Sequence, residues 1–141
     1  MKVLIAVDET ESARHATRAA QHLFPSAEHI VLSSAELPPF VFGVALGGLI
    51  SVPSDALSSA IEANAEKNVT AAAAAFPDEV ALRDVSTGDA GLVICREAAR
   101  LGVDVVVVGR EEKSTVSRLL HPSVSDYVMK NAPCPVLVVR E

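Results

Sequence analysis

Two parts of the chain hold the residues best suited to bind a ligand. Asp8 directly follows one apolar run, and Gly109 ends another. Further along, Ser123, Val124 and Ser125 open a stretch with the pattern of a helix start. A glycine lets the backbone approach a ligand closely, and the first N–H groups of a helix attract anions. These five residues are therefore candidates for a ligand-binding pocket.

Three of these candidates also have a purely structural explanation. Asp8 is suited to cap the following helix or the turn before it. Gly109 can serve only the tight exit from its strand. Ser123 fits the N-cap position of a helix, where a serine can also contact a ligand. Both explanations stay open for all three residues at the level of sequence.

The sequence contains no recognisable arrangement for catalysis or metal binding. The four histidines, at positions 15, 22, 29 and 121, are scattered and have no metal-ligand spacing. His121 has no nucleophile and orienting acid beside it in the sequence, which favours a surface position. Cys95 and Cys134 form no Cys-x-x-Cys pair and are expected to pack in the core. We therefore expect no enzyme activity and no bound metal.

Apolar and amphipathic segments alternate along the chain. Continuous apolar runs favour strands buried on both faces of a parallel sheet, and apolar residues at three- and four-residue steps favour helices. The expected strands are 3–7, 29–32, 80–85, 103–108 and 136–139, and the expected helices cover 12–24, 54–76, a segment from Asp89 to Gly102, and a segment from Ser123 that stops by Ala132.

This order predicts a single α/β domain over residues 1–141. Its core is a doubly wound five-stranded parallel sheet with helices on both faces. Ligands of such sheets lie beyond the carboxyl ends of the strands, where the strand order reverses. Asp8 and Gly109 follow two such strand ends, so the expected pocket lies there.

The charge balance argues against several classes of partner. The 141 residues include 12 Lys and Arg against 18 Asp and Glu, which gives a net charge of −6. No nucleic acid is expected, because its binders need basic residues to replace counterions. Prolines and glycines in the longest uncharged stretch, 37–54, argue against a membrane-spanning helix. With no secretory signal pattern, we expect a cytoplasmic location.

Several segments resemble the universal stress protein (UspA) family, in order and over essentially the whole chain. They are Val105–Gly109, Ser123–Ser125 and Ala132–Val139, supported by 3–8, by Gly88-Asp89 and by 101–104. The Ala-Pro-Cys-Pro-Val sequence before the last strand is the most specific of them. The resemblance implies the five-stranded fold of the adenine nucleotide alpha hydrolase-like proteins and a regulatory function in the stress response.

Family members that bind ATP share a pattern after the fourth strand: Gly, two residues, Gly, nine residues, Gly, then Ser or Thr. Gly109 matches the first glycine and Ser123 the closing serine, but Glu112 and Pro122 replace the other two glycines. Glu112 adds a negative charge, and proline has no N–H to donate. The resemblance also implies that Asp8 contacts the adenine side. We therefore expect an altered pocket that binds ATP poorly.

An alternative hypothesis is a nucleotide-dependent switch that binds ATP or AMP in this pocket. Arg110, Lys113 and Arg118 flank the same loop and can reach phosphates. The first N–H groups of the last helix would still attract an anion. A third hypothesis, slow ATP hydrolysis, has only fold analogy behind it.

Two segments are expected to contact partners. The resemblance places Val136–Val139 at the edge of the sheet, and pairing of two such edges about a twofold axis would cover it. Family members commonly dimerise through this strand, so a homodimer is expected. The uncharged segment Phe40–Val52 is long for a connection. It is expected to cover the pocket, join the dimer contact or bind another protein, unless it forms a short helix on the sheet.

Overall fold

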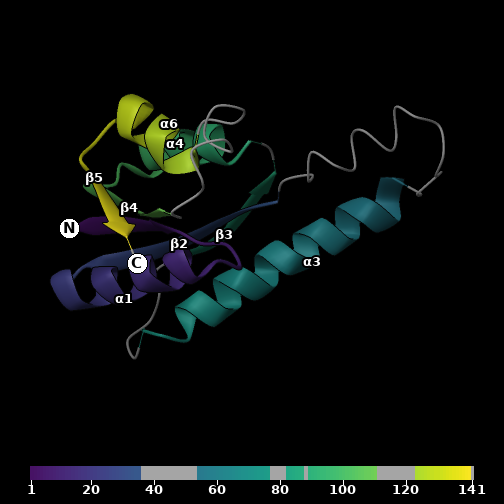
Figure 1. Cartoon of the computed structure of the whole chain (residues 1–141), viewed down its shortest axis with the longest axis horizontal. Helices are drawn as coiled ribbons and strands as arrows, with labels where there is room; N and C mark the ends of the chain where they lie inside the picture. The colour runs from purple at the N-terminus through teal and green to yellow at the C-terminus, as the bar shows by residue number, and fades with distance from the viewer. Residues whose placement is uncertain (36–53, 77–81, 88, 111–122, 141) are drawn as a thin grey trace.

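The computed structural model describes residues 1–35, 54–76, 82–87, 89–110 and 123–140. Within these ranges, strands and helices alternate along the chain (Figure 1). The strands are β1 (Lys2–Ala6), β2 (Glu28–Ala35), β3 (Leu82–Thr87), β4 (Val105–Arg110) and β5 (Val136–Arg140); the helices are α1 (Glu11–Leu23), α3 (Ser54–Ala73), α4 (Ala90–Leu101) and α6 (Val124–Asn131). All strand pairings are parallel, in the order β3-β2-β1-β4-β5. The predicted doubly wound α/β fold is confirmed.

Helices cover both faces of the sheet, with α1 and α3 on one face and α4 and α6 on the other (Figure 1). On one face, α4 and α6 share a buried apolar cluster with Leu4. On the opposite face, α1 and α3 share a second cluster with Ile5. Neighbouring residues of a strand point to opposite faces, so the central strands need apolar side chains at every position.

The strand order reverses next to β1. The chain adds β2 and then β3 on one side of β1, and it crosses to the other side to add β4 and β5. Val3 pairs with Val105 and Ile5 with Val107. Because the two strands are parallel and in this register, their carboxyl ends lie side by side, which brings Asp8 close to Gly109.

The ends of the helices follow local capping chemistry. The side chains of Asp89 and Ser123 cap α4 and α6, as predicted. Gly102 ends α4 with a φ of 59°, a left-handed conformation that glycine adopts without strain. Ala132 is the C-cap residue of α6 and lies immediately before Pro133. The cap of α1, Thr10, was not expected from the sequence.

Some element boundaries differ from the prediction. β2 is longer than 29–32, β3 is shifted from 80–85 to Leu82–Thr87, and α3 ends at Ala73 rather than 76. β4 begins at Val105, not at Val103, because the Val103 N–H still bonds to the Ala98 carbonyl of α4. These shifts leave the order of elements unchanged.

The two cysteines are free and half-buried against the cluster beneath α4 and α6. Burial raises the pKa of both the Cys95 and the Cys134 thiol, so both stay protonated at neutral pH. Their surroundings fit the packing role predicted for them. In the ranges described, none of the helices combines the length and apolarity needed to cross a membrane.

His29 is a buried titratable residue in the core of the α1–α3 face. Its side chain stacks on Phe76, with 4.3 Å between the ring centroids. His29 is 7% exposed, and its Nε2 has no hydrogen-bond partner among the described residues. Burial lowers the pKa of His29, because the charged ring would lose its hydration, and hydrogen bonding to the backbone of Phe24 and Ala20 offsets only part of that loss.

This packing predicts an acid-dependent loss of stability. The unfolded chain protonates His29 near pH 6.5, whereas the folded chain does so only at lower pH. The stabilisation from neutral His29 is therefore fully present above pH of about 6.5 and is lost as the pH falls toward the lowered pKa. Urea unfolding at pH 7 and pH 5 should show a smaller loss of stability for His29→Phe than for the wild type.

The exposed His22 offers a matched control, because its ring lies outside the core. His22→Gln should keep the pH dependence of the wild type. Equal losses of unfolding free energy in His29→Phe and the wild type would contradict the assigned role of His29.

Candidate functional site

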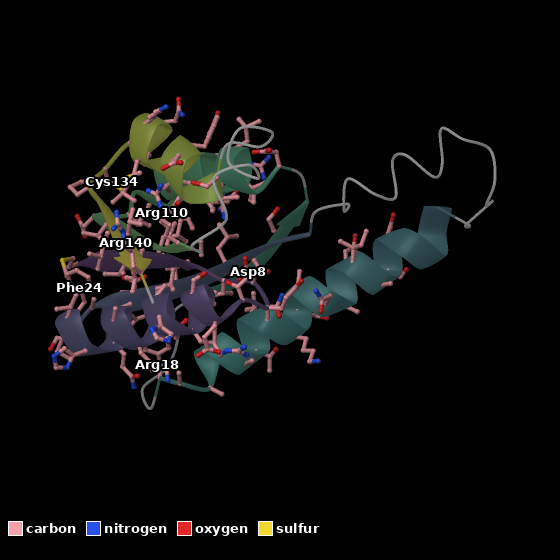
Figure 2. All side chains as sticks on the ribbon, in the orientation of Figure 1. Asp8, Arg18, Phe24, Arg110, Cys134 and Arg140 are labelled. Carbon is pink, nitrogen blue, oxygen red and sulfur yellow. The ribbon has the colours of Figure 1, made fainter. Side chains whose placement is uncertain are left out.

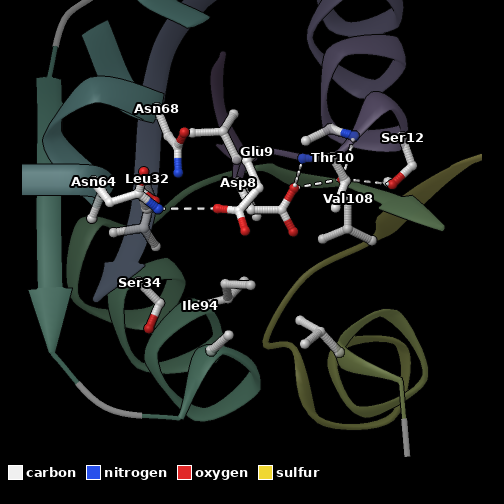
Figure 3. Close-up of a pocket in the computed structure, with 18 of the residues that line it drawn as sticks. Asp8, Glu9, Thr10, Ser12, Leu32, Ser34, Asn64, Asn68, Ile94 and Val108 are labelled. Atoms are coloured by element: carbon white, nitrogen blue, oxygen red, sulfur yellow. Dashed lines mark hydrogen bonds between the residues drawn. The ribbon is translucent and has the colours of Figure 1, made fainter. Parts of the chain in front are cut away.

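A cavity of about 430 Å³ lies beyond the carboxyl ends of β1, β2 and β4 (Figure 3). Its position is the point of strand reversal predicted for a ligand. Its volume is within the range of small-molecule sites. Of the predicted site residues, Asp8, Gly109 and Val124 line it, and Ser123 and Ser125 flank Val124 in the sequence.

Asp8 organises the turn between β1 and α1. Its Oδ1 accepts hydrogen bonds from the Thr10 N–H at 2.9 Å and from the Thr10 hydroxyl at 2.5 Å (Figure 3). The Thr10 hydroxyl oxygen in turn accepts from the Ala13 N–H at the start of α1, and it lies 2.9 Å from the Ser12 hydroxyl oxygen. Asp8 Oδ1 therefore stabilises the turn before α1, which is one of the two roles expected for Asp8. Its other oxygen, Oδ2, takes part in none of these bonds.

Gly109 lets α1 approach the end of β4. A Cβ atom at this position would lie 2.4 Å from both the carbonyl carbon and the carbonyl oxygen of Ser12. Those atoms belong to the backbone of the first turn of α1, which cannot move away without displacing the helix. The close approach of α1 is thus sufficient reason for a glycine here, whether or not a ligand also benefits.

Polar side chains that the sequence analysis did not single out form the wall nearest α3. The Asn64 amide donates to Glu9 Oε2 at 3.1 Å (Figure 3). Asn68 lies one turn further along α3, and Ser33 and Ser34 line the cavity from the end of β2. The sequence does carry one indication of this wall. Asn64 and Asn68 are four residues apart, beside the apolar stripe of α3, so they lie on the same side of the helix.

The start of α6 forms the opposite wall. The Ser123 hydroxyl caps the helix by accepting from the Asp126 N–H at 3.1 Å, and it lies 3.1 Å from the Ser125 hydroxyl oxygen. Arg110, on the α6 side of the sheet (Figure 2), pairs with Asp126 at 3.0 Å. The guanidinium proposed to reach phosphates is therefore held by a carboxylate in this structure.

Three helices begin at the cavity wall. Ser12 in the first turn of α1, Ala90 of α4 and Val124 of α6 all line it. In each helix the N-cap side chain accepts a hydrogen bond from the N–H of the third helical residue. The N–H groups of the first two helical residues are not bonded to that side chain. Helix N-termini carry partial positive charge, so this wall suits an anionic group.

Other predicted features lie outside the described residues. They are Glu112 and Pro122 of the altered loop, Lys113 and Arg118, His121, and the segment Phe40–Val52. Among the residues that the structure does describe, no group of three or more His, Cys, Asp or Glu side chains is placed to hold a metal ion.

The comparisons with known proteins all point to the same family. The model of the universal stress protein family matches residues 1–140. A Staphylococcus haemolyticus protein named as a universal stress protein is 44% identical over 43 residues, which are 30% of this chain and 26% of that protein. The matches span about a quarter to a third of the curated relatives' lengths.

Solved structures share the fold over nearly the whole chain. A universal stress protein in complex with cAMP is 23% identical, with a TM-score of 0.64, covering 99% of this chain and 96% of its own. A universal stress family protein of Arabidopsis thaliana with AMP bound is 18% identical, with a TM-score of 0.62, covering 100% of this chain and 92% of its own. At this identity, the likeness shows the fold.

The contact at Gly109 leads to a prediction about stability. Gly109→Ala should destabilise the protein by about 1–3 kcal/mol, because overpacking against backbone forces the helix to shift. Amide chemical shifts should change at residues 11–13, at the start of α1. Urea unfolding and NMR spectra measure both effects.

Gly102→Ala is the comparison variant, because nothing lies within 4 Å of the added Cβ and only its positive φ causes strain. Its stability should fall without shift changes at residues 11–13. A Gly109→Ala protein as stable as the wild type would show that α1 does not depend on this contact.

Proposed function

The chain belongs to the universal stress protein family, and from this premise we propose that it is a non-catalytic regulatory domain with an altered nucleotide pocket. The cavity takes a nucleoside monophosphate more readily than ATP. The observation that supports this proposal most directly is that α4 and α6 begin at the cavity across from the Asp8–Glu9 carboxylates, which directly precede α1 (Figure 3).

The two walls suit different parts of a nucleotide. The helix N-termini favour an anionic phosphate. The carboxylates of Asp8 and Glu9 and the amides of Asn64 and Asn68 suit the amino and hydroxyl groups of a nucleoside. A ligand with one phosphate satisfies both walls within a cavity of about 430 Å³.

The sequence of the following loop argues against a triphosphate. Glu111 and Glu112 bring two carboxylates to the segment where ATP-binding relatives have a bare glycine backbone. Two like charges about 4 Å apart repel by about 4 kcal/mol at an effective dielectric constant near 20. Pro122 also removes one N–H donor. Even part of this repulsion corresponds to more than about tenfold in affinity.

The described polar residues of the cavity favour binding over catalysis. The hydroxyls of Thr10 and Ser12 are engaged in the cap of α1 and its neighbourhood. No His, Cys or Lys is among the described residues that line the cavity. The described lining therefore offers no imidazole, thiol or amine as a base or nucleophile, which supports a binding role.

The second candidate function is a switch that binds ATP or AMP and changes its interactions accordingly. The relatives solved with cAMP and with AMP support adenine nucleotide binding, which both candidates require. The two candidates differ in their expected preference between phosphate chains, so one titration separates them.

Calorimetric titration with AMP and with Mg-ATP tests the proposal. The wild type should bind AMP more than about tenfold more tightly than ATP. The double variant Glu112→Gly, Pro122→Gly should gain ATP affinity with little change for AMP. Micromolar binding of ATP by the wild type, with no gain in the double variant, would instead support the ATP switch.

We further propose that the domain forms a homodimer through β5. This strand is at the edge of the sheet, and Val136–Val139 are only half-buried. The Val106 N–H donates to the Pro135 carbonyl. In a parallel pairing, the N–H groups of Leu137 and Val139 then face β4 and those of Val136 and Val138 face outward. A second β5 can accept these donors and cover the edge.

Sedimentation of Val138→Pro tests the dimer, because proline removes one outward donor and spares the pairing with β4. The variant should sediment as a monomer where the wild type is a dimer. Val138→Thr keeps the N–H and a similar shape, and it should stay dimeric. A dimer that survives the proline would place the interface elsewhere.

A further inference from the structure

A second hollow, of about 400 Å³, lies as a groove between α1 and α3. It shares Val7, Asp8, Glu9, Ala13 and the two asparagines of α3 with the first cavity, and from there it extends along the helices away from α6. Its described lining is Val7, Asp8, Glu9, Ala13, Arg14, Thr17, Arg18, Asn64, Lys67, Asn68, Ala71, Ala72 and Ala75. The proposed nucleotide function makes no use of the part of this groove beyond the shared residues.

Small side chains leave the space between the two helices unfilled. The floor consists largely of alanines, and Thr17 turns its hydroxyl back to the Ala13 carbonyl at 2.9 Å. That hydroxyl is therefore satisfied, and the floor presents mostly apolar atoms. A larger residue at any of these positions would fill the groove.

Hydrogen bonds between side chains and the facing segment hold the groove at both ends. Near β1, the Asn64 amide donates to Glu9 Oε2 at 3.1 Å. At the other end, the Gln21 amide donates to the Ala75 carbonyl at 2.6 Å. These contacts join α3 to the segment before α1, and α1 to the segment after α3. The length between them suits a small molecule better than a peptide that passes through.

Positive charge borders the groove, although the chain as a whole carries −6. Arg14, Arg18 and Lys67 line it, and Arg18 is labelled on the α1 side in Figure 2. Arg14 Nε and Arg18 Nη2 bond to Glu11 at 2.8 and 3.2 Å. Each guanidinium has five N–H donors, so pairing with one carboxylate leaves donors for another anion.

We propose that this groove binds a small amphipathic anion, an aromatic or short aliphatic group that carries one carboxylate, sulfonate or phosphate. The apolar part lies on Ala13, Thr17 and Ala71, and the anion lies between Arg18 and Lys67. The acidic pair Asp8–Glu9 repels the anion from the end shared with the nucleotide cavity, which fixes the direction of the ligand.

Two fluorescent probes with the same ring system test the proposal on the full chain. They are 8-anilinonaphthalene-1-sulfonate, which is anionic, and N-phenyl-1-naphthylamine, which is neutral. The anionic probe should bind at one site and about tenfold more tightly than the neutral one. Amide shifts should change around Thr17, Asn68 and Ala72. Equal affinities would mean that both probes bind exposed apolar surface and that the anionic group contributes nothing. This result would overturn the proposal.

Charge variants separate the groove from general electrostatics. Arg18→Glu should lower the affinity for the anionic probe by about two- to fivefold, as expected for a partly exposed charge. It should leave the affinity for the neutral probe unchanged. Lys130→Glu on α6 makes the same change in net charge away from the groove, and it should have no effect. Equal effects of the two variants would contradict the proposed anion position.

Steric variants locate the probe. Ala71→Trp fills the groove from the exposed side of α3 and should abolish binding, whereas Thr70→Trp, which is exposed and outside the lining, should not. Val124→Trp obstructs the nucleotide cavity and should leave probe binding intact while AMP binding is lost. Probe binding that is lost in Val124→Trp and kept in Ala71→Trp would assign the probe to the nucleotide cavity and refute the groove site.

Discussion

The close approach of α1 to the end of β4 is the contact on which the candidate site depends. Gly109 allows it, because any side chain there would overlap the Ser12 backbone. With α1 held at that distance, the turn that Asp8 and Thr10 stabilise lies against the carboxyl ends of the central strands. The first turn of α1 then faces the same cavity as the first turns of α4 and α6. A glycine selected for packing thus also determines where an anion can lie.

Capping and ligand binding use different donors at these helix starts. Thr10, Asp89 and Ser123 each accept from the third N–H of their helix, which stabilises each helix without a ligand. The first two N–H groups of each helix take no part in these side-chain caps. The Arg110–Asp126 pair adds a further constraint on the start of α6, so the helix starts that line the cavity are held by contacts within the chain. Preorganisation of this kind reduces the ordering cost of binding.

The sequence predicted what local chemistry and strand periodicity control. The caps Asp89 and Ser123 and the terminating Gly102 were found because each acts within a few residues of its own helix. Contacts across long sequence separations were not found. Asn64 meets Glu9 across 55 positions, and no local pattern encodes that meeting. The partner of Arg110 was missed because Asp126 was interpreted only as part of a helix start. The roles of Glu112 and Pro122 still rest on sequence.

The alanine run 71–75 shows how one composition serves several purposes. Ala73 is 3% exposed and packs in the core, whereas Ala71, Ala72 and Ala75 line the groove beside α1. From the sequence, the run indicates only a strong helix former. In the fold, the same small side chains leave the space between α1 and α3 unfilled, while Gln21 bonds to the Ala75 carbonyl at one end and Asn64 to Glu9 at the other. Larger apolar residues would bury more surface but would remove the groove, so the space between these helices depends directly on residue size.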